Sequence, residues 1–316
     1  MVNAFVDMNA YLEPLILIAA IIIGSASGMM YSFHPNLVNY SIVAMLCCLF
    51  FNVSIAHLLQ GVKNKKYLSV AWVFNFILLP TIAFLISSIF VDNGSMVFVG
   101  LILYLVAPCT DWFLGFTKLA DGNVDVNMAL LPINLLSQIL LVPVYLLLFT
   151  NSNAQLQLDA FFDVFLYWVL YPFLVAQGVR YLLFKMGDSA LNKSRDFAEW
   201  GMFISLTVLV LAIFNNNIQS LLSNLVILPK TLIIVVCFFI LVYFLGQFIS
   251  QKIDFTRAEK ASLIITGSAR NTPLMLAISV ALFPGETVIQ LILILGMLIE
   301  FPHLILLSFL LRKTRS

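Results

Sequence analysis

Long apolar segments recur along the whole chain and are separated by short polar stretches. Each is about 20 residues long, which is the length that an α-helix needs to cross the hydrocarbon core of a bilayer. Gly24 and Gly28 lie four residues apart in the first segment, a small-xxx-small spacing that favours close helix packing. The pattern predicts about ten transmembrane helices, near residues 13–32, 37–60, 67–91, 97–118, 126–150, 159–184, 199–223, 226–250, 259–283 and 287–311.

The composition places this chain in a membrane. Of 316 residues, 62% are hydrophobic and 10% are charged, whereas soluble domains carry about 25% charged residues. We therefore expect a single integral membrane domain whose apolar surface faces lipid. The net charge of +1 gives no indication of a nucleic-acid partner.

Basic residues gather in alternate loops, which predicts the orientation of the helices. Fourteen of the 16 lysines and arginines fall on one side of the ten predicted spans. By the positive-inside rule that side is cytoplasmic. We expect a multi-pass protein of the cell membrane with both termini in the cytoplasm. The residues are Lys63, Lys65, Lys66, Lys118, Arg180, Lys185, Lys193, Arg195, Lys252, Arg257, Lys260, Arg312, Lys313 and Arg315.

The longest basic loop, near 180–198, divides the chain into two sets of five spans. An odd number of spans in each set gives the sets opposite orientations, as in the inverted repeats of many transporters. The first repeat covers about 12–150 within residues 1–185, which also hold the start of the second, and the second repeat covers 158–312. The predicted fold is an all-α membrane protein with two inverted five-helix repeats.

The fourth and ninth spans are interrupted at corresponding positions of the two repeats. Pro108 breaks the fourth and Pro273 the ninth, and an ionisable residue stands beside each break, Asp111 and Arg270 respectively. Backbone groups freed at a break cannot face lipid, so they line a polar cavity or are capped by protein. Paired broken helices mark the binding sites of secondary transporters near the bilayer midplane.

Several side chains near the breaks could carry chemistry. Cys109 follows Pro108, Asn271 follows Arg270, and Asn134 and Gln138 lie on one face of the fifth span. A charge at mid-membrane costs about 2.5–3.5 kcal/mol, which favours function for the charged positions. Cys109 could instead be a small buried hydrophobe, the usual state of a free cysteine. The three histidines lack the spacing of metal ligands, and without a catalytic motif we expect no enzyme, metal or cofactor.

These motifs resemble the bile acid:sodium symporter superfamily, and within it most closely the arsenite-efflux permeases. The resemblance rests on Ala107–Cys109 in the fourth span, Asn134 and Gln138 in the fifth, and Ile299–Pro302 in the tenth. It implies two inverted five-helix repeats whose fourth and ninth helices are broken and cross. It also implies that Cys109 and Glu300 are required for arsenite transport. Thiols suit trivalent arsenic, which is soft, and an intramembrane carboxylate such as Glu300 can carry a proton.

The chain departs from the sodium-coupled members of that superfamily. Their ninth span carries Glu-x-Gly-x-Gln-Asn, whereas Thr266–Asn271 here lacks the glutamate and has Arg270 in place of the glutamine. Phe113 and Leu114 stand where those members have Ser-Asn in the fourth span. These changes argue against sodium coupling, and a guanidinium can instead bind an oxyanion in a bidentate manner.

Two functions follow from these residues, and the sequence leaves their partners open. The first is proton-coupled efflux of arsenite or a similar metalloid hydroxide, as by an antiporter. The alternative is ion-coupled transport of a small organic anion. Arg270 could pair with Asp111 across the crossover or with Glu300. The oligomeric state and the direction of transport stay open.

Overall fold

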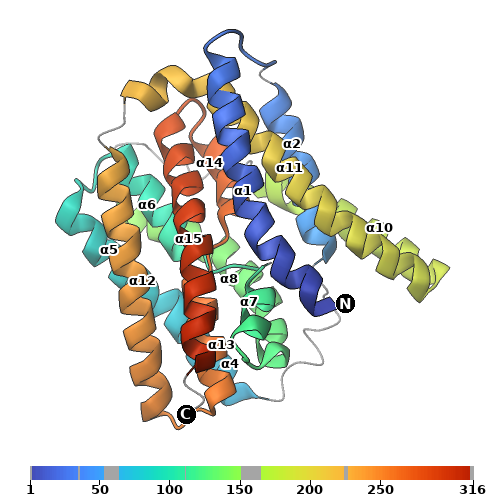
Figure 1. The fold of residues 1–316 in the computed structure, drawn as a ribbon, viewed down its shortest axis with the longest axis vertical. Coiled ribbons are helices and arrows are strands. Elements are labelled where there is room, and N and C mark those ends of the chain that lie inside the picture. Colours follow the sequence, from blue (N-terminus) through green and yellow to red (C-terminus); the bar gives the residue numbers. More distant parts are fainter. Residues whose placement is uncertain are drawn as a thin grey trace. The chain divides into compact units, whose positions relative to one another are not determined.

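The computed structural model describes residues 2–34, 36–52, 64–110, 112–150, 165–223 and 227–313. Within these ranges all regular secondary structure is helical, so the all-α prediction is confirmed (Figure 1). The helices are α1 (Val2–Gly28), α2 (Asn36–Asn52), α4 (Lys65–Val73), η1 (Phe74–Leu78), α5 (Leu79–Phe90), α6 (Met96–Val106), α7 (Phe113–Leu119), α8 (Val124–Phe149), η2 (Phe165–Leu170), α10 (Tyr171–Met186), α11 (Asp188–Ser223), α12 (Ile227–Lys252), α13 (Arg257–Ser268), α14 (Thr272–Leu282) and α15 (Thr287–Lys313).

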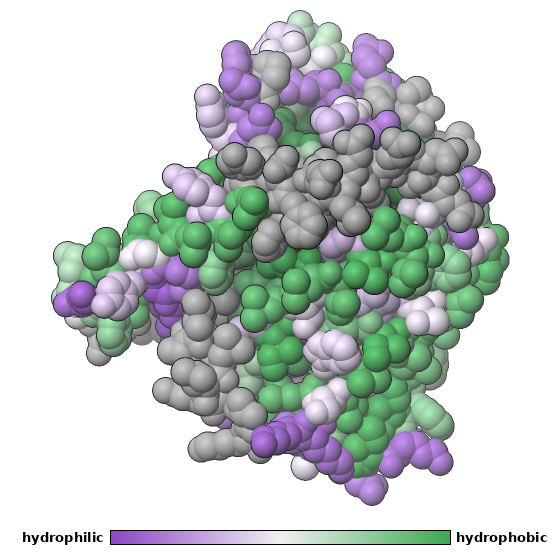
Figure 2. Space-filling model, turned by 180° about the vertical axis from the view of Figure 1, so that it is seen from behind, coloured by the Kyte–Doolittle hydropathy of each residue, from purple (hydrophilic) through white to green (hydrophobic). Residues whose placement is uncertain are grey.

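Five helical stretches within the described ranges are long and apolar enough to cross a membrane: Lys65–Phe90, Val124–Phe149, Lys193–Gln219, Ile227–Lys252 and Thr287–Arg312. Shorter apolar helices accompany them, among them α6 and α14, which adjoin the predicted breaks. Figure 2 shows apolar side chains over much of the face in view, interrupted by hydrophilic patches. The chain is therefore a multi-pass membrane protein.

The stretch 180–198 differs from the predicted loop because almost all of it is helical. α10 continues to Met186 and α11 begins at Asp188. Gly187 joins the two with a φ of 114°, a value that residues other than glycine rarely adopt. Polar residues outside the hydrocarbon core can still form helix, so charge alone does not predict where a helix ends.

The chain forms two compact units, and each unit draws its segments from both predicted repeats. The first unit contains residues 1–54, 155–225 and 273–291. The second unit contains residues 55–154, 226–272 and 292–316. Both predicted breaks, apart from Pro273 itself, belong to the second unit.

Close helix packing organises the first unit. α1 and α2 both contact α11, and α10 packs against α2. A Cβ atom on Gly24 would lie 2.5 Å from the carbonyl oxygen of Leu211, and one on Gly28 would overlap the backbone of Asn215. The small-xxx-small face predicted in the first span therefore brings α1 directly onto the backbone of α11.

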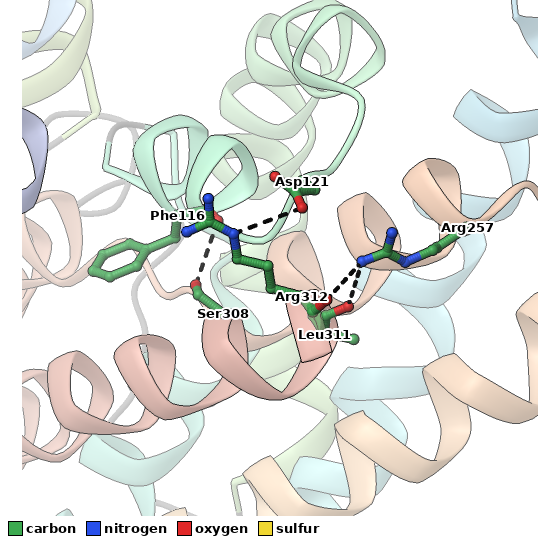
Figure 3. Close-up of polar contacts among 6 residues, drawn as sticks. All are labelled: Phe116, Asp121, Arg257, Ser308, Leu311 and Arg312. Carbon is green, nitrogen blue, oxygen red and sulfur yellow. Dashed lines mark hydrogen bonds and ion pairs between the residues drawn. The ribbon is translucent and has the colours of Figure 1, made fainter. Parts of the chain in front are cut away.

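One end of the second unit is held by polar contacts among α7, α13 and α15 (Figure 3). Nη2 of Arg257 donates to the carbonyls of Leu311 at 3.1 Å and Arg312 at 3.0 Å, where the last carbonyls of α15 have no partner within the helix. Arg312 forms an ion pair with Asp121 at 3.7 Å, and the hydroxyl of Ser308 donates to the carbonyl of Phe116. These contacts tie the outer ends of both broken helices to α15.

Candidate functional site at the crossing of the broken helices

Two short non-helical segments interrupt the fourth and ninth spans within the second unit. α6 ends at Val106 and α7 begins at Phe113, so Pro108 lies between helices. α13 ends at Ser268 and α14 begins at Thr272. Pro273 therefore lies in the first turn of α14, where its missing amide hydrogen costs no helical hydrogen bond. The ninth-span interruption is the segment that precedes Pro273.

The two interruptions pair with each other through their backbones. Pro108 and Arg270 face each other in a short antiparallel bridge. The amide of Cys109 donates to the carbonyl of Ala269, and the amide of Asn271 donates to the carbonyl of Ala107, both at 2.9 Å. Each break thus satisfies polar backbone groups that the other exposes, as a buried non-helical segment requires.

Glu300 of α15 connects three parts of this crossing. Its side chain is fully buried. It accepts hydrogen bonds from the hydroxyl of Tyr104 at 3.0 Å, the indole Nε1 of Trp112 at 2.9 Å, and the backbone amide of Arg270 at 2.9 Å. The carboxylate therefore binds both sides of the fourth-span break and the ninth-span break together. Its contact with Arg270 runs through the main chain.

Gly296 lies one turn before Glu300 on α15 and allows Tyr104 to reach the carboxylate. A Cβ atom at Gly296 would lie 2.6 Å from two ring atoms of Tyr104. The ring is fully buried and cannot move aside easily. Only glycine fits at this position without displacing the tyrosine.

Arg270 is a buried cation whose hydrogen bonds are incomplete. The side chain has no exposed surface; its Nη1 donates to the carbonyl of Leu105 at 2.8 Å, and its guanidinium carbon lies 5.0 Å from the ring centre of Phe238. Its Nε and Nη2 are buried and have no hydrogen-bond partner in the described parts of the chain. A desolvated cation–π contact is worth about 2 kcal/mol, whereas a buried charge without a counter-ion costs several kcal/mol.

The sequence offers Asp111 and Glu300 as alternative counter-ions for Arg270. Glu300 forms no ion pair with the guanidinium within 4.0 Å. Asp111 lies outside the described residues, so a pair between Asp111 and Arg270 stays a prediction.

A second set of polar side chains lies near Thr266, which is in α13, the half of the ninth span that precedes the break. The carbonyl of Cys109 and the hydroxyl of Thr266 each accept from Nδ2 of Asn134 at 3.5 Å, and Nδ2 of Asn75 donates to Thr266 at 3.2 Å. The Oδ1 atoms of Asn75 and Asn134, and both amide atoms of Gln138, are buried without a partner among the described residues. Buried polar atoms are normally satisfied, so this group has capacity for water, an ion or substrate.

The structure brings most of the predicted site residues into one region. Cys109 is buried at the bridge, and Asn134 reaches its carbonyl. Asn271 lies at the same bridge and donates from Nδ2 to the hydroxyl of Thr110 at 3.0 Å. Gln138 lies one turn further along α8 than Asn134. The sequence prediction did not include four residues of this region: Tyr104, Trp112, Thr266 and Gly296.

Comparison with known proteins identifies the family of this chain. The chain matches the family model described as "Sodium Bile acid symporter family" over residues 39–224, more than half of its length. The matched region contains Cys109, Asn134 and Gln138 and ends before Arg270 and Glu300. No curated protein matches the chain.

Proposed function

Since this chain belongs to the sodium bile acid symporter family and is an ion-coupled membrane transporter, we propose that it exports arsenite or a similar metalloid hydroxide in exchange for protons. The proposal includes ten spanning helices in two inverted repeats of five, with both termini in the cytoplasm. The crossing of the broken helices is its substrate site.

The position of Cys109 carries this proposal. Its side chain is buried, and its backbone is fixed on both sides, through the amide to Ala269 and through the carbonyl to Asn134. Trivalent arsenic is soft and prefers thiol ligands. A single thiol at a substrate site binds such a ligand while still allowing release.

Glu300 supports proton coupling because its carboxylate accepts hydrogen bonds from residues at both breaks. It accepts from Tyr104, Trp112 and the amide of Arg270, and hydrogen bonds to an ionised acceptor are stronger than those to a neutral one. Taking up a proton would weaken all three contacts at once. Proton binding would then change the geometry of the substrate site.

Growth of an arsenite-sensitive host tests the substrate. We expect the parent chain to protect the host and to lower cellular arsenic, and we expect Cys109→Ser to lose protection at equal abundance in the membrane. Cys237→Ser is the matched control, because Cys237 is a half-buried free cysteine in α12. Failure of the parent to protect, or full protection by Cys109→Ser, would reject arsenite export through this thiol.

The coupling ion is tested in vesicles that contain the protein. We expect arsenite transport to follow an imposed pH gradient and to be unchanged when sodium is replaced by potassium. A requirement for sodium would contradict proton coupling.

A further inference from the structure

The guanidinium of Arg270 has one occupied side and one free edge. Nη1 donates to the carbonyl of Leu105, and the face of the group lies over Phe238. The atoms without partners in the described parts of the chain are Nε and Nη2. In a planar guanidinium these two nitrogens point their N–H bonds in parallel along the same edge, away from Nη1. This pair of parallel donors binds two oxygens of one carboxylate or similar oxyanion.

The charge of Arg270 is not neutralised by a direct ion pair within the described residues. The carboxylate of Glu300 binds Tyr104, Trp112 and the main-chain amide of Arg270, and it forms no ion pair with the guanidinium. Glu300 attracts the guanidinium electrostatically without contacting it as an ion pair. A fully buried cation whose Nε and Nη2 have no hydrogen-bond partner among the described residues still attracts an anion, because the local dielectric constant is low.

Two hydroxyls flank Arg270 in the chain and are free as well. Oγ of Ser268 and Oγ1 of Thr272 are buried and have no hydrogen-bond partner among the described residues. Ala269 between Ser268 and Arg270 is extended, with φ of −80° and ψ of 134°. Ser268 ends α13 and Thr272 begins α14, so both hydroxyls border the short segment that carries Arg270 and are candidate further donors to a ligand on the free edge.

We propose that Arg270 binds an oxyanion through Nε and Nη2, with a carboxylate or an ionised metalloid hydroxide as the ligand class. The inference rests on the proposed function in taking the crossing as the substrate site. Arg270 then selects for ligands that present two oxygens on one side.

Thermal unfolding of the purified full-length protein, with acetate as the probe and chloride as the comparison at equal ionic strength, tests this proposal. We expect acetate to raise the unfolding midpoint in a saturable manner and chloride to have little effect. Arg270→Lys keeps the charge but loses the parallel donors. This variant should bind acetate more weakly, so the half-saturating acetate concentration should rise by about tenfold. Arg312→Lys makes the same exchange in an exposed ion pair and should leave the acetate response unchanged.

Equal stabilisation by chloride and acetate, or an unchanged acetate response in Arg270→Lys, would overturn the proposal. If Arg270→Lys does not fold, the contrast between acetate and chloride on the parent protein still decides. Arsenite protection reports on the proposed function separately. Export of arsenite without any acetate effect would reject only the oxyanion site, and an acetate effect without protection would reject only arsenite as the substrate.

Discussion

Glu300 has a structural role and a proposed transport role that substitutions can separate. In Glu300→Gln the remaining carbonyl oxygen can still accept from Trp112 and Arg270, and the hydroxyl of Tyr104 can turn to accept from the new amide. We expect a loss of roughly 1 kcal/mol in the free energy of unfolding and transport that no longer responds to a pH gradient. Denaturant unfolding and vesicle transport at several pH gradients measure the two effects.

Glu300→Ala removes the acceptor for all three donors and should cost roughly 3–5 kcal/mol, because buried groups lose their partner. Glu286→Gln, in the exposed turn before α15, is the control and should change neither property. If Glu300→Gln still transported normally in response to a pH gradient, this carboxylate would be excluded as the proton carrier.

At the scale of elements, the contact between α1 and α11 depends on the absence of side chains. Gly28→Ala would place a methyl group against the backbone of Asn215, which cannot rotate away. We expect the free energy of unfolding to fall by about 1–3 kcal/mol. Gly178→Ala in α10 is the matched control, since a Cβ atom there meets nothing within 4 Å. An equally small effect for both substitutions, measured by thermal unfolding, would show that α1 does not need this close approach.

The elements also show what the sequence could predict. The glycine spacing of α1 and the interruptions near Pro108 and Pro273 are local patterns. α1 packs closely at its glycines, and helices end or begin close to both prolines. The partners of Glu300 are not local: Tyr104 and Trp112 are 196 and 188 residues away in sequence. Nothing in the spacing of the chain specifies that such residues meet, because only the tertiary fold brings them together. The close contact between Gly296 and Tyr104 could not be predicted for the same reason.

At the scale of the whole molecule, charge asymmetry predicts which ends of the helices face the cytoplasm. Asp92 lies in the exposed connection between α5 and α6, and Lys252 lies at the exposed end of α12. We expect Asp92→Cys to react with a membrane-impermeant maleimide on intact cells, and Lys252→Cys to react only after permeabilisation. The parent protein gives the background from its four native cysteines. Labelling of both variants from the same side would refute the predicted orientation.

The bridge between the two breaks fixes a register as well as a position. Cys109 pairs with Ala269 and Asn271 pairs with Ala107, so inserting one residue into either segment would shift this pairing by one. A shift by one in an extended pair turns each side chain to the opposite face. Arg270 would then leave Leu105 and Phe238, even though its identity was unchanged. The lengths of the two segments are therefore coupled, and we expect a length change in one segment to require a compensating change in the other.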